Sequence, residues 1–479
     1  MVPDRFARVL EELAPLAERF AAAGHRLYLV GGAVRDLLVG TDGVGFDFDL
    51  TTDARPPEVK ALLRGWGDAV WTQGEKFGTI GAHRHRPDGS TRTVEVTTFR
   101  SEAYTDESRK PHVTFADDIE ADLARRDFTI NAMALELLPG DAGVDVALID
   151  PHGGAADLAT ATLRTPLTPE ISFDDDPLRM LRAARFIAGY GLAPVPELVA
   201  AVIDRGPRLA IVSAERIRDE LDKLIVLDAP SAGLWFLVDT GLAEQFLPEL
   251  PALRLEHDPI HRHKDVLSHT IAVVENVTPA LAGGAYDFRI TRLAALFHDI
   301  GKPTTRGFQA GKGTTFHHHD VVGARLTRRR MEALRYPAAD IAAVSELVFL
   351  HLRFHTYKMG WSDAAVRRYV RDAGALLQEL NVLTRCDCTT RDERKAARLS
   401  RRMDELEDRI GVLAEQEELA AIRPELDGRE VMEQLGIAPG PLVGEALAFL
   451  LDIRLDEGQI GHDEAMKRLD AWWQDRRAT

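Results

Sequence analysis

Residues 29–50 read LVGGAVRDLLVGTDGVGFDFDL, and the last four letters set the chemistry that the fold must support. Asp47 and Asp49 alternate with Phe46 and Phe48 in a strand-like run. A period of two places both carboxylates on one face of a strand and both rings on the other. Carboxylates a few ångströms apart repel each other unless a proton or a cation lies between them, and their hard oxygens favour Mg²⁺. A solvated strand face is the alternative for an isolated pair.

The glycine pair at positions 31 and 32 separates a strand-like run from the helical pattern AVRDLLVG. Its spacing matches neither of two common phosphate loops, G-x-G-x-x-G and G-x-x-x-x-G-K-[ST]. Adjacent glycines before a helix would let the backbone approach a triphosphate, with N–H groups and Arg35 as donors. A tight strand-to-helix turn without a ligand is the alternative.

The composition is that of a soluble globular protein, with 45% hydrophobic and 28% charged residues among 479. No run of 18 apolar residues occurs, and residues 1–20 follow an amphipathic helical pattern rather than that of a signal peptide, which predicts a cytoplasmic protein. The net charge of −17 excludes binding of nucleic acid through overall charge, so a phosphate-rich partner must meet a local basic patch. Cys386 and Cys388 are too few for a disulfide framework.

Hydrophobic periodicity divides the chain. Residues 26–150 alternate short apolar runs with glycine turns, which indicates an α/β or α+β unit. Helical spacing dominates from about 155 onward, and 10 of the 16 histidines lie between His257 and His355. From 391 the sequence predicts a long charged amphipathic helix, followed by a tail punctuated by glycine and proline.

Six motifs occur in the order of a known family. They are GGAVRD (31–36), DFD (47–49), RRDFTINAMA (125–134), DPHGG (150–154), DDPLRMLRAARF (175–186) and ERIRDE (215–220). In this combination the chain resembles class II tRNA nucleotidyltransferases and poly(A) polymerases, members of the polymerase β superfamily, over about residues 25–250. Six ordered motifs are far more specific than any one of them.

The resemblance implies an α+β fold with a polymerase-β-like nucleotidyltransferase head that contains a mixed sheet. The expected domains are this head over 1–150, an all-α neck with nucleotide-selecting and RNA-binding helices over 151–254, a helical histidine-rich domain over 255–395 and a helical tRNA-binding tail over 396–479.

Within the head, the resemblance implies roles for individual residues. Asp47 and Asp49 match the catalytic carboxylates that hold Mg²⁺, and Glu95 is a candidate third. Asp127 could accept hydrogen bonds from ribose hydroxyls while the arginines before it face phosphate; a helix-end charge cluster is the alternative. The expected nucleotide-binding residues are Gly31, Gly32, Arg35, Arg126, Asp127, Asp175, Asp176, Arg179, Arg182 and Arg185.

Asp176 and Arg179 are three positions apart, so on a helix they would share a face and could contact one ligand together. Cytosine and adenine both present an amine beside a ring nitrogen, so a carboxylate and a guanidinium should accept C and A and reject U and G. A helix-surface salt bridge is the alternative. Relatives usually carry Glu where this chain has Asp175, which puts only that contact in question. Arg182 and Arg185 could face the triphosphate or the RNA end, or bridge to the neck.

Residues 97–115 resemble the flexible loop with which CCA-adding members switch from C to A addition. Members that add only CC lack a working version of that loop. Its presence favours complete CCA addition, and a long polar hairpin loop is the alternative.

LFHDIGKP (296–303) introduces a second candidate site. Histidine and carboxylate suit a divalent or binuclear metal centre. The set resembles the HD phosphohydrolase superfamily over about 255–395, where a metal-activated water would attack a phosphoester such as a 2′,3′-cyclic phosphate at an RNA 3′ end. The implied ligands are His269, His298, Asp299 and Asp387, with His319 and His351 for a second metal of unknown identity. Lys302 could bind phosphate, His261 and His263 are alternative first ligands, and a degenerate scaffold domain is the alternative for the whole set.

The densest basic run, Arg391 to Arg402, contains Arg394, Arg398 and Arg401 as candidate contacts to tRNA phosphates. The solvated face of a helix is the commoner explanation of such a run. Residues 436–447 resemble the tail motif of the family, and a plain turn explains them equally well.

The sequence therefore predicts a CCA-adding tRNA nucleotidyltransferase that transfers CMP and AMP from CTP and ATP to the tRNA 3′ end. Phosphohydrolysis of RNA 3′ phosphates or cyclic phosphates is an expected second activity. A bacterial poly(A) polymerase or an A-adding enzyme of the same family is the nearest alternative. An alarmone synthetase/hydrolase would carry the two domains in the reverse order, and intact carboxylates at both sites argue against an inactive RNA-binding protein.

Overall fold

The computed structural model describes residues 4–40, 47–86, 89–103, 112–116, 118–140, 143–255, 265–310, 313–356, 361–388, 393–416 and 422–478. They form two compact units, Met1–Leu224 with Ala232–Gln245, and Ile225–Ser231 with Phe246–Thr479. Among these residues, no helix combines the length and the apolar character that crossing a bilayer requires.

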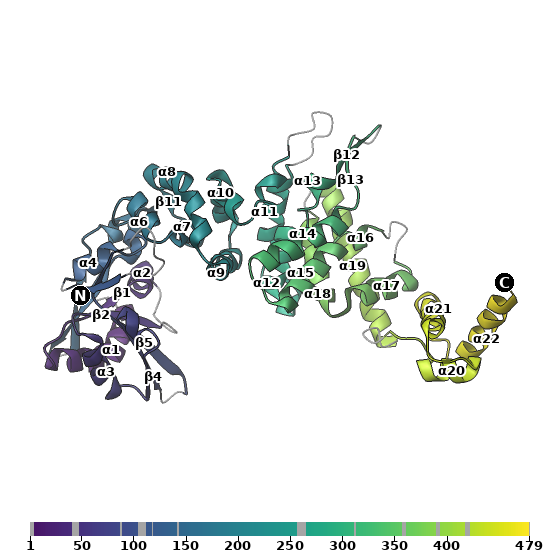
Figure 1. The fold of residues 1–479 in the computed structure, drawn as a ribbon, viewed down its shortest axis with the longest axis horizontal. Coiled ribbons are helices and arrows are strands. Elements are labelled where there is room, and N and C mark those ends of the chain that lie inside the picture. The colour runs from purple at the N-terminus through teal and green to yellow at the C-terminus, as the bar shows by residue number, and fades with distance from the viewer. Residues whose placement is uncertain are drawn as a thin grey trace. The chain divides into compact units, whose positions relative to one another are not determined.

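A seven-stranded mixed sheet organises the first unit, in the order β3-β4-β5-β2-β1-β8-β9. Strands β1, β2, β4 and β5 of this sheet are labelled in Figure 1. Strands β2 and β5 run parallel, whereas the other neighbouring pairs are antiparallel. The strands are β1 (Leu27–Val30), β2 (Phe48–Thr52), β3 (Ala69–Trp71), β4 (Thr79–His85), β5 (Thr91–Thr98), β8 (Ala134–Gly140) and β9 (Gly143–Ile149). The predicted mixed-sheet α+β head is confirmed, and β3 is too short for the sequence to show alternation.

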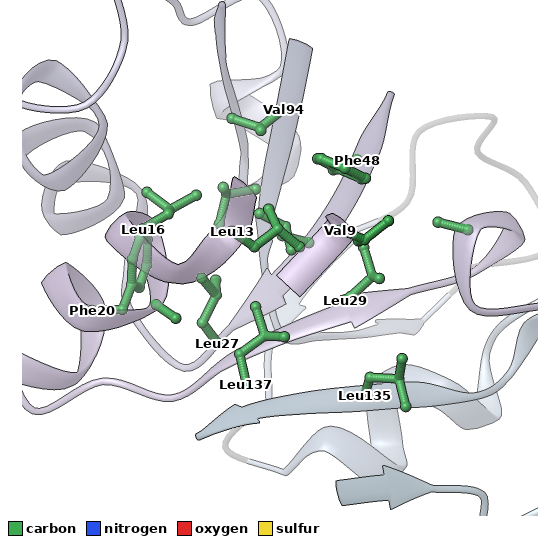
Figure 2. Close-up of a cluster of buried hydrophobic side chains, with 14 of the residues drawn as sticks. Val9, Leu13, Leu16, Phe20, Leu27, Leu29, Phe48, Val94, Leu135 and Leu137 are labelled. Atoms are coloured by element: carbon green, nitrogen blue, oxygen red, sulfur yellow. The ribbon is translucent and has the colours of Figure 1, made fainter. Parts of the chain in front are cut away.

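One face of the sheet is covered by an amphipathic helix, as residues 1–20 predict. Val9, Leu13, Leu16 and Phe20 recur every three or four positions and pack on the sheet core (Figure 2). The helices of the head are α1 (Asp4–Ala22), α2 (Gly32–Val39), α3 (Pro56–Arg64), α4 (Ile119–Ala124) and α5 (Gly154–Ala159). A separate hairpin pairs β6 (Arg100–Ala103) with β7 (His112–Phe115).

Helices follow the head, as the change of period predicts. They are α6 (Pro169–Asp175), α7 (Leu178–Tyr190), α8 (Pro196–Arg205), α9 (Ala214–Ile225) and α10 (Ser231–Asp239), with the short pair β10 (Thr162–Leu163) and β11 (Ala193–Pro194).

In its described residues, the second unit is helical apart from one hairpin. Its elements are α11 (Val266–Asn276), α12 (Phe288–Phe297), α13 (Lys302–Thr305), β12 (Arg306–Gln309), β13 (Gly313–Phe316), α14 (His319–Ala333), α15 (Ala338–Leu350), α16 (Arg353–Thr356), α17 (Asp363–Ala373), α18 (Leu377–Asp387), α19 (Glu393–Gln416), α20 (Gly428–Leu435), α21 (Pro441–Glu457) and α22 (His462–Ala478). The predicted long helix is α19. The sequence did not predict the β12–β13 hairpin, because its two strands have only four residues each and include two glycines. The boundaries of the four predicted domains remain predictions.

Candidate active sites

Three carboxylates gather where β2 and β5 run side by side. Asp47 and Asp49 are exposed, while Phe48 between them is 1% exposed in the core. The predicted alternation is therefore confirmed for these three, and Phe46 lies outside the described residues. Asp49 is in register with Glu95 of the neighbouring strand, which brings the candidate third carboxylate to the pair.

The ionisation of this cluster shows how its charges interact. Loss of hydration raises the pKa of Asp49 above its ordinary range, Arg126 opposes the shift, and Asp47 adds to it. Loss of hydration also raises the pKa of Glu95, and both aspartates reinforce that shift. Asp49 and Glu95 are both harder to ionise beside neighbouring carboxylates, so a cation at this cluster would relieve the repulsion. The donor set fits a hard divalent ion.

The glycine pair makes room for two guanidinium groups. Gly31 has φ 72° and ψ −136°, and a Cβ there would lie 3.1 Å from Nη1 of Arg126. A Cβ on Gly32 would lie 3.3 Å from Nη2 of Arg35. The turn therefore serves close packing of arginines on the backbone at the start of α2.

Arg35 is held on several sides. Its Nη1 donates to Oδ1 of Asn131 at 2.6 Å, its Nε donates to Asp36 at 2.8 Å, and its guanidinium lies 4.2 Å from the ring centre of Tyr190. These contacts fix the guanidinium beside Gly32, and its contact with a triphosphate stays a prediction.

Asp122 is a functional candidate that the sequence reasoning missed. Its fully buried carboxylate accepts from Arg125 at 2.8 Å and from Arg126 at 3.2 Å. Although burial raises its pKa, the two arginines lower it below the ordinary range. Asp122 therefore anchors the arginine that lies over Gly31 and near Asp49. The spacing of three and four residues in DLARR was the available signal.

Asp127 uses both of its oxygens within the protein. Oδ1 accepts from the backbone N–H of Phe128 at 2.9 Å and from Asn131 at 3.0 Å. Oδ2 accepts from Nε and Nη2 of Arg182 at 2.9 and 2.6 Å. Burial opposes ionisation, but Arg182 and Asn131 lower the pKa of Asp127. Asp127 thus links the head to α7, and its predicted ribose contact stays a prediction.

The proposed base-reading pair is arranged differently from the expectation. Asp176 is not helical but extended, with φ −143° and ψ 99°, because α6 ends at Asp175 and Pro177 interrupts the helical run. Its carboxylate accepts from the backbone N–H of Leu178 at 3.2 Å and from Arg216 at 2.7 Å.

Arg179 has separate partners. It donates to Oγ of Ser172 at 2.9 Å and to the carbonyl of Arg125. Among the described residues no salt bridge joins it to Asp176, so the helix-surface salt bridge is not formed. Both side chains are half-buried beside the head.

Two further arginines of α7 meet the ERIRDE motif. Glu220 is buried and accepts from Arg185 at 2.8 Å, with Arg182 at 3.7 Å. The predicted bridge to the neck is therefore formed by both arginines. Asp175 lies half-buried at the end of α6.

The DPHGG motif supports the loop behind the site. Asp150 accepts from the backbone N–H groups of Gly154 and Ala155 at 2.7 and 2.9 Å. A Cβ on Gly154 would lie 2.1 Å from the carbonyl oxygen of Thr129, so only glycine permits this packing. Residues 104–111 of the predicted C-to-A switching loop lie outside the described residues, and β6 and β7 flank them.

All six predicted HD-type ligands lie together in the second unit, and they form two adjoining groups. In the first group, Nε2 of His269 lies 2.9 Å from Asp387 and 3.3 Å from Nε2 of His298. In the second, Nε2 atoms of His319 and His351 are 3.3 Å apart.

Asp299 lies between the two groups. Its Oδ2 is 3.2 Å from Nε2 of His298, and its Oδ1 is 3.5 Å from Nε2 of His319. One carboxylate therefore faces both histidine pairs, which is the geometry of a bridging ligand. His261 and His263, the alternative first ligands, lie outside the described residues.

Three of these histidines have their tautomer set by the backbone. Nδ1 of His298, His319 and His351 lies 2.8, 2.8 and 2.6 Å from the carbonyl oxygen three residues earlier. A carbonyl only accepts, so each Nδ1 carries a hydrogen and each Nε2 is directed at the centre. Nε2 lone pairs 3.3 Å apart require a shared proton or a cation between them, and the site fits divalent metal.

Charges at this centre are strongly coupled. Burial alone would lower the pKa of His298, but Asp299 and Asp387 raise this pKa to about 10. Burial and the nearby His298 lower the pKa of His351 to about 4. Lys302, predicted to bind phosphate, donates to Oδ2 of Asp299 at 2.6 Å.

The candidate tRNA contacts Arg394, Arg398 and Arg401 are exposed on α19.

Comparison with known families agrees with this architecture. The Poly A polymerase head domain matches residues 27–164, the probable RNA and SrmB-binding site of polymerase A matches 191–253, and the HD domain matches 266–392. These matches define a nucleotidyltransferase joined to an HD domain.

Similar proteins identify the class of nucleotidyltransferase to which the chain belongs. Over 457 residues, the chain is 32% identical to an A-adding tRNA nucleotidyltransferase of Deinococcus radiodurans, covering 93% of this chain and 95% of that one. It is 31% identical to a CC-adding tRNA nucleotidyltransferase of Thermus thermophilus, covering 93% of both. A CCA-adding enzyme of Lactobacillus gasseri is 37% identical, over 51% of this chain and 56% of its own. The chain belongs to the family of tRNA nucleotidyltransferases and poly(A) polymerases, which confirms the predicted family and enzyme class.

Solved structures share the fold. The Bacillus stearothermophilus CCA-adding enzyme in complex with CTP has a TM-score of 0.65 at 24% identity over 98% of both chains. The Thermotoga maritima CCA-adding enzyme complexed with tRNA has a TM-score of 0.60 at 19% identity, covering 97% of this chain and 95% of that one.

Proposed function

We propose that this enzyme completes the CCA end of tRNA, transferring CMP and AMP from CTP and ATP to the 3′ end with release of pyrophosphate. The observation that supports acceptance of both cytosine and adenine is that Asp176 and Arg179 retain hydrogen-bonding groups that their protein partners do not use. A carboxylate has about four acceptor sites and a guanidinium five N–H donors, and the contacts of the described residues use two and three of them. An acceptor beside a donor fits the amine and ring nitrogen of both cytosine and adenine.

Asp47 and Asp49, with Glu95 beside them, would hold Mg²⁺. Bound there, the ion would activate the terminal hydroxyl and stabilise the pyrophosphate leaving group. Arg126 would face the triphosphate, since it lies over Gly31 and within electrostatic reach of Asp49. Asp122 would orient Arg126. We expect the enzyme to act in the cytoplasm.

The tRNA would contact the enzyme through phosphates. Arg394, Arg398 and Arg401 are exposed on one long helix. Guanidinium groups at that spacing can contact phosphates of the tRNA backbone without reading the base sequence. Because the whole chain is acidic, a local stripe is required for this contact.

Three tRNA transcripts test the function, one lacking CCA, one ending after the first C and one ending after both. With CTP and ATP together, each transcript should be extended to CCA and no further. CTP alone should stop at CC, and ATP alone should extend only the transcript that already ends after both C residues. A long A tail, or no incorporation of C, would contradict the proposal. In Asp176→Ala, CTP and ATP should lose their advantage over UTP and GTP, because the acceptor for the amine is removed.

Addition of A alone is the second candidate. The A-adding relative matches 93% of this chain, as the CC-adding relative does, whereas the CCA-adding relative of Lactobacillus gasseri matches 51%. In that case only the transcript ending after both C residues is extended, and only with ATP.

The HD domain would carry a second activity, hydrolysis of phosphoesters at RNA 3′ ends. Six ligands in two groups around a shared Asp299 support a binuclear centre, and two divalent ions there would supply an activated water. The fit of the ligands to metal favours this over a degenerate scaffold.

A further inference from the structure

The β12–β13 hairpin lies between α13 and α14 and extends away from the helices of its unit (Figure 1). Phe308 on this hairpin is 74% exposed, the largest value among the bulky hydrophobic side chains that the structure describes. An exposed aromatic ring offers a flat face on which a base can stack.

The register of the hairpin places Phe308 on a defined face. Arg306 is opposite Phe316, and Phe308 is opposite Thr314. Opposite residues of an antiparallel pair, and residues two apart on one strand, point to the same side. One face therefore carries Arg306 and Phe308, with Phe316 as its third large side chain.

The base of this face is part of the HD centre. The ring of Phe316 lies 5.8 Å from Nζ of Lys302, and that ammonium donates to the bridging Asp299 at 2.6 Å. The carbonyl of Phe316 also accepts from Nδ1 of His319 at 2.8 Å. Phe308 stands diagonal to Phe316, about 7–8 Å away, so the exposed ring lies one step outward from the metal ligands.

The charge of this face suits a polyanion. Arg306 is exposed on β12 and forms no salt bridge with any carboxylate of the described residues. Lys302 stands at the inner end, and the exposed His317 and His318 follow β13. Asp320 is the acidic side chain of the same turn, and it is half-buried.

We propose that Arg306 and Phe308 bind the single-stranded 3′ end of an RNA whose terminal phosphate enters the HD centre. A base stacks on the ring of Phe308, and Arg306 contacts the phosphate between that base and the last nucleotide. The proposal rests on the proposed HD activity and deepens it, because it makes the substrate an oligonucleotide rather than a free nucleotide.

Hydrolysis of two substrates by the full-length, Mn²⁺-loaded enzyme tests this. Adenosine 2′,3′-cyclic phosphate occupies the metal centre alone, whereas a triadenylate with a 3′-terminal 2′,3′-cyclic phosphate also reaches the hairpin. Phe308→Ala should lower kcat/KM for the trinucleotide by about tenfold, mainly through KM, and leave the mononucleotide unchanged. Phe308→Trp should retain trinucleotide activity. Equal effects on both substrates, or none, would overturn the proposal.

A binding measurement separates failure of the hairpin from failure of the HD activity. In EDTA, fluorescence anisotropy of a labelled triadenylate 3′-phosphate should show about tenfold weaker binding by Phe308→Ala than by wild type. Phe77→Ala removes a 48% exposed phenylalanine of the first unit and should leave binding unchanged. If wild type hydrolyses neither substrate, the HD activity is refuted and this measurement still decides the hairpin. Wild type that binds trinucleotide no better than mononucleotide refutes the RNA surface and leaves a protein partner.

Discussion

Gly31→Ala should disable nucleotide addition by moving one arginine. The left-handed φ of 72° with ψ −136° lies outside the region that alanine tolerates, and the new Cβ would stand 3.1 Å from Nη1 of Arg126. Arg126 cannot give way freely, because Asp122 holds its Nη2 at 3.2 Å from the other side.

Two energies follow from this geometry. Backbone strain of this kind costs about 1–3 kcal/mol of folding free energy. Displacing Arg126 from a phosphate would forfeit a charge-assisted hydrogen bond of about 1.5–3 kcal/mol, a loss of about 10-fold to 150-fold in kcat/KM for the nucleotide.

Gly40→Ala is the matched control, at the other end of the same helix. Gly40 has φ 105° and nothing within 4 Å of a built Cβ, so it carries strain without displacing a neighbour. Incorporation of CMP into tRNA lacking CCA should stay within about threefold of wild type in this variant, with about 1 kcal/mol less stability.

Arg126→Ala completes the test. If Gly31 acts through Arg126, adding Gly31→Ala to Arg126→Ala should lower kcat/KM no further. A folded Gly31→Ala enzyme with wild-type kcat/KM, or fully additive losses in the double variant, would refute the reasoning.

Four further outcomes are expected. The raised pKa values of Asp49 and Glu95 mean that protons compete with Mg²⁺ at higher pH than at ordinary carboxyls, so the Mg²⁺ required for half-maximal incorporation should increase as pH falls. Because the folded state raises these pKa values, the stability of the metal-free protein should fall as the pH rises above the ordinary carboxyl pKa and these groups ionise. Asp49→Asn removes one of these charges and should therefore raise Tm near pH 7, although it should abolish nucleotide incorporation. Metal analysis of the purified enzyme should give two divalent ions at the HD centre, and about one in His351→Ala. Arg292→Met should lower the urea-derived free energy of unfolding by about 3 kcal/mol, because the fully buried guanidinium donates to the carbonyls of Val277, Leu227 and Asp228.

The fold and the candidate metal ligands were accessible from the sequence because they depend on patterns of few residues. Alternation in DFD places Asp49 outward and Phe48 inward whatever surrounds them. The HD ligands occur in ordered motifs whose resemblance implied all six, and the structure brings all six together.

The contacts that hold Asp127 and Asp176 were not accessible, because their partners lie far away in the chain. Asp127 meets Arg182 across 55 positions, and Asp176 meets Arg216 across 40. Sequence spacing assumed one continuous helix through Asp176, whereas Pro177 starts a new one. Asp122 was overlooked since a carboxylate within a charged helix usually faces water, and only the fold shows that this one is buried.

The histidines of the HD centre have a consequence for how such a site changes over time. His298, His319 and His351 are each oriented by a carbonyl of their own local turn, only three positions away. No distant side chain has to vary in concert with them. A single substitution at one of these histidines would therefore be expected to abolish metal binding at the proposed HD centre, and the reverse substitution to restore it, with no change at the nucleotidyltransferase site.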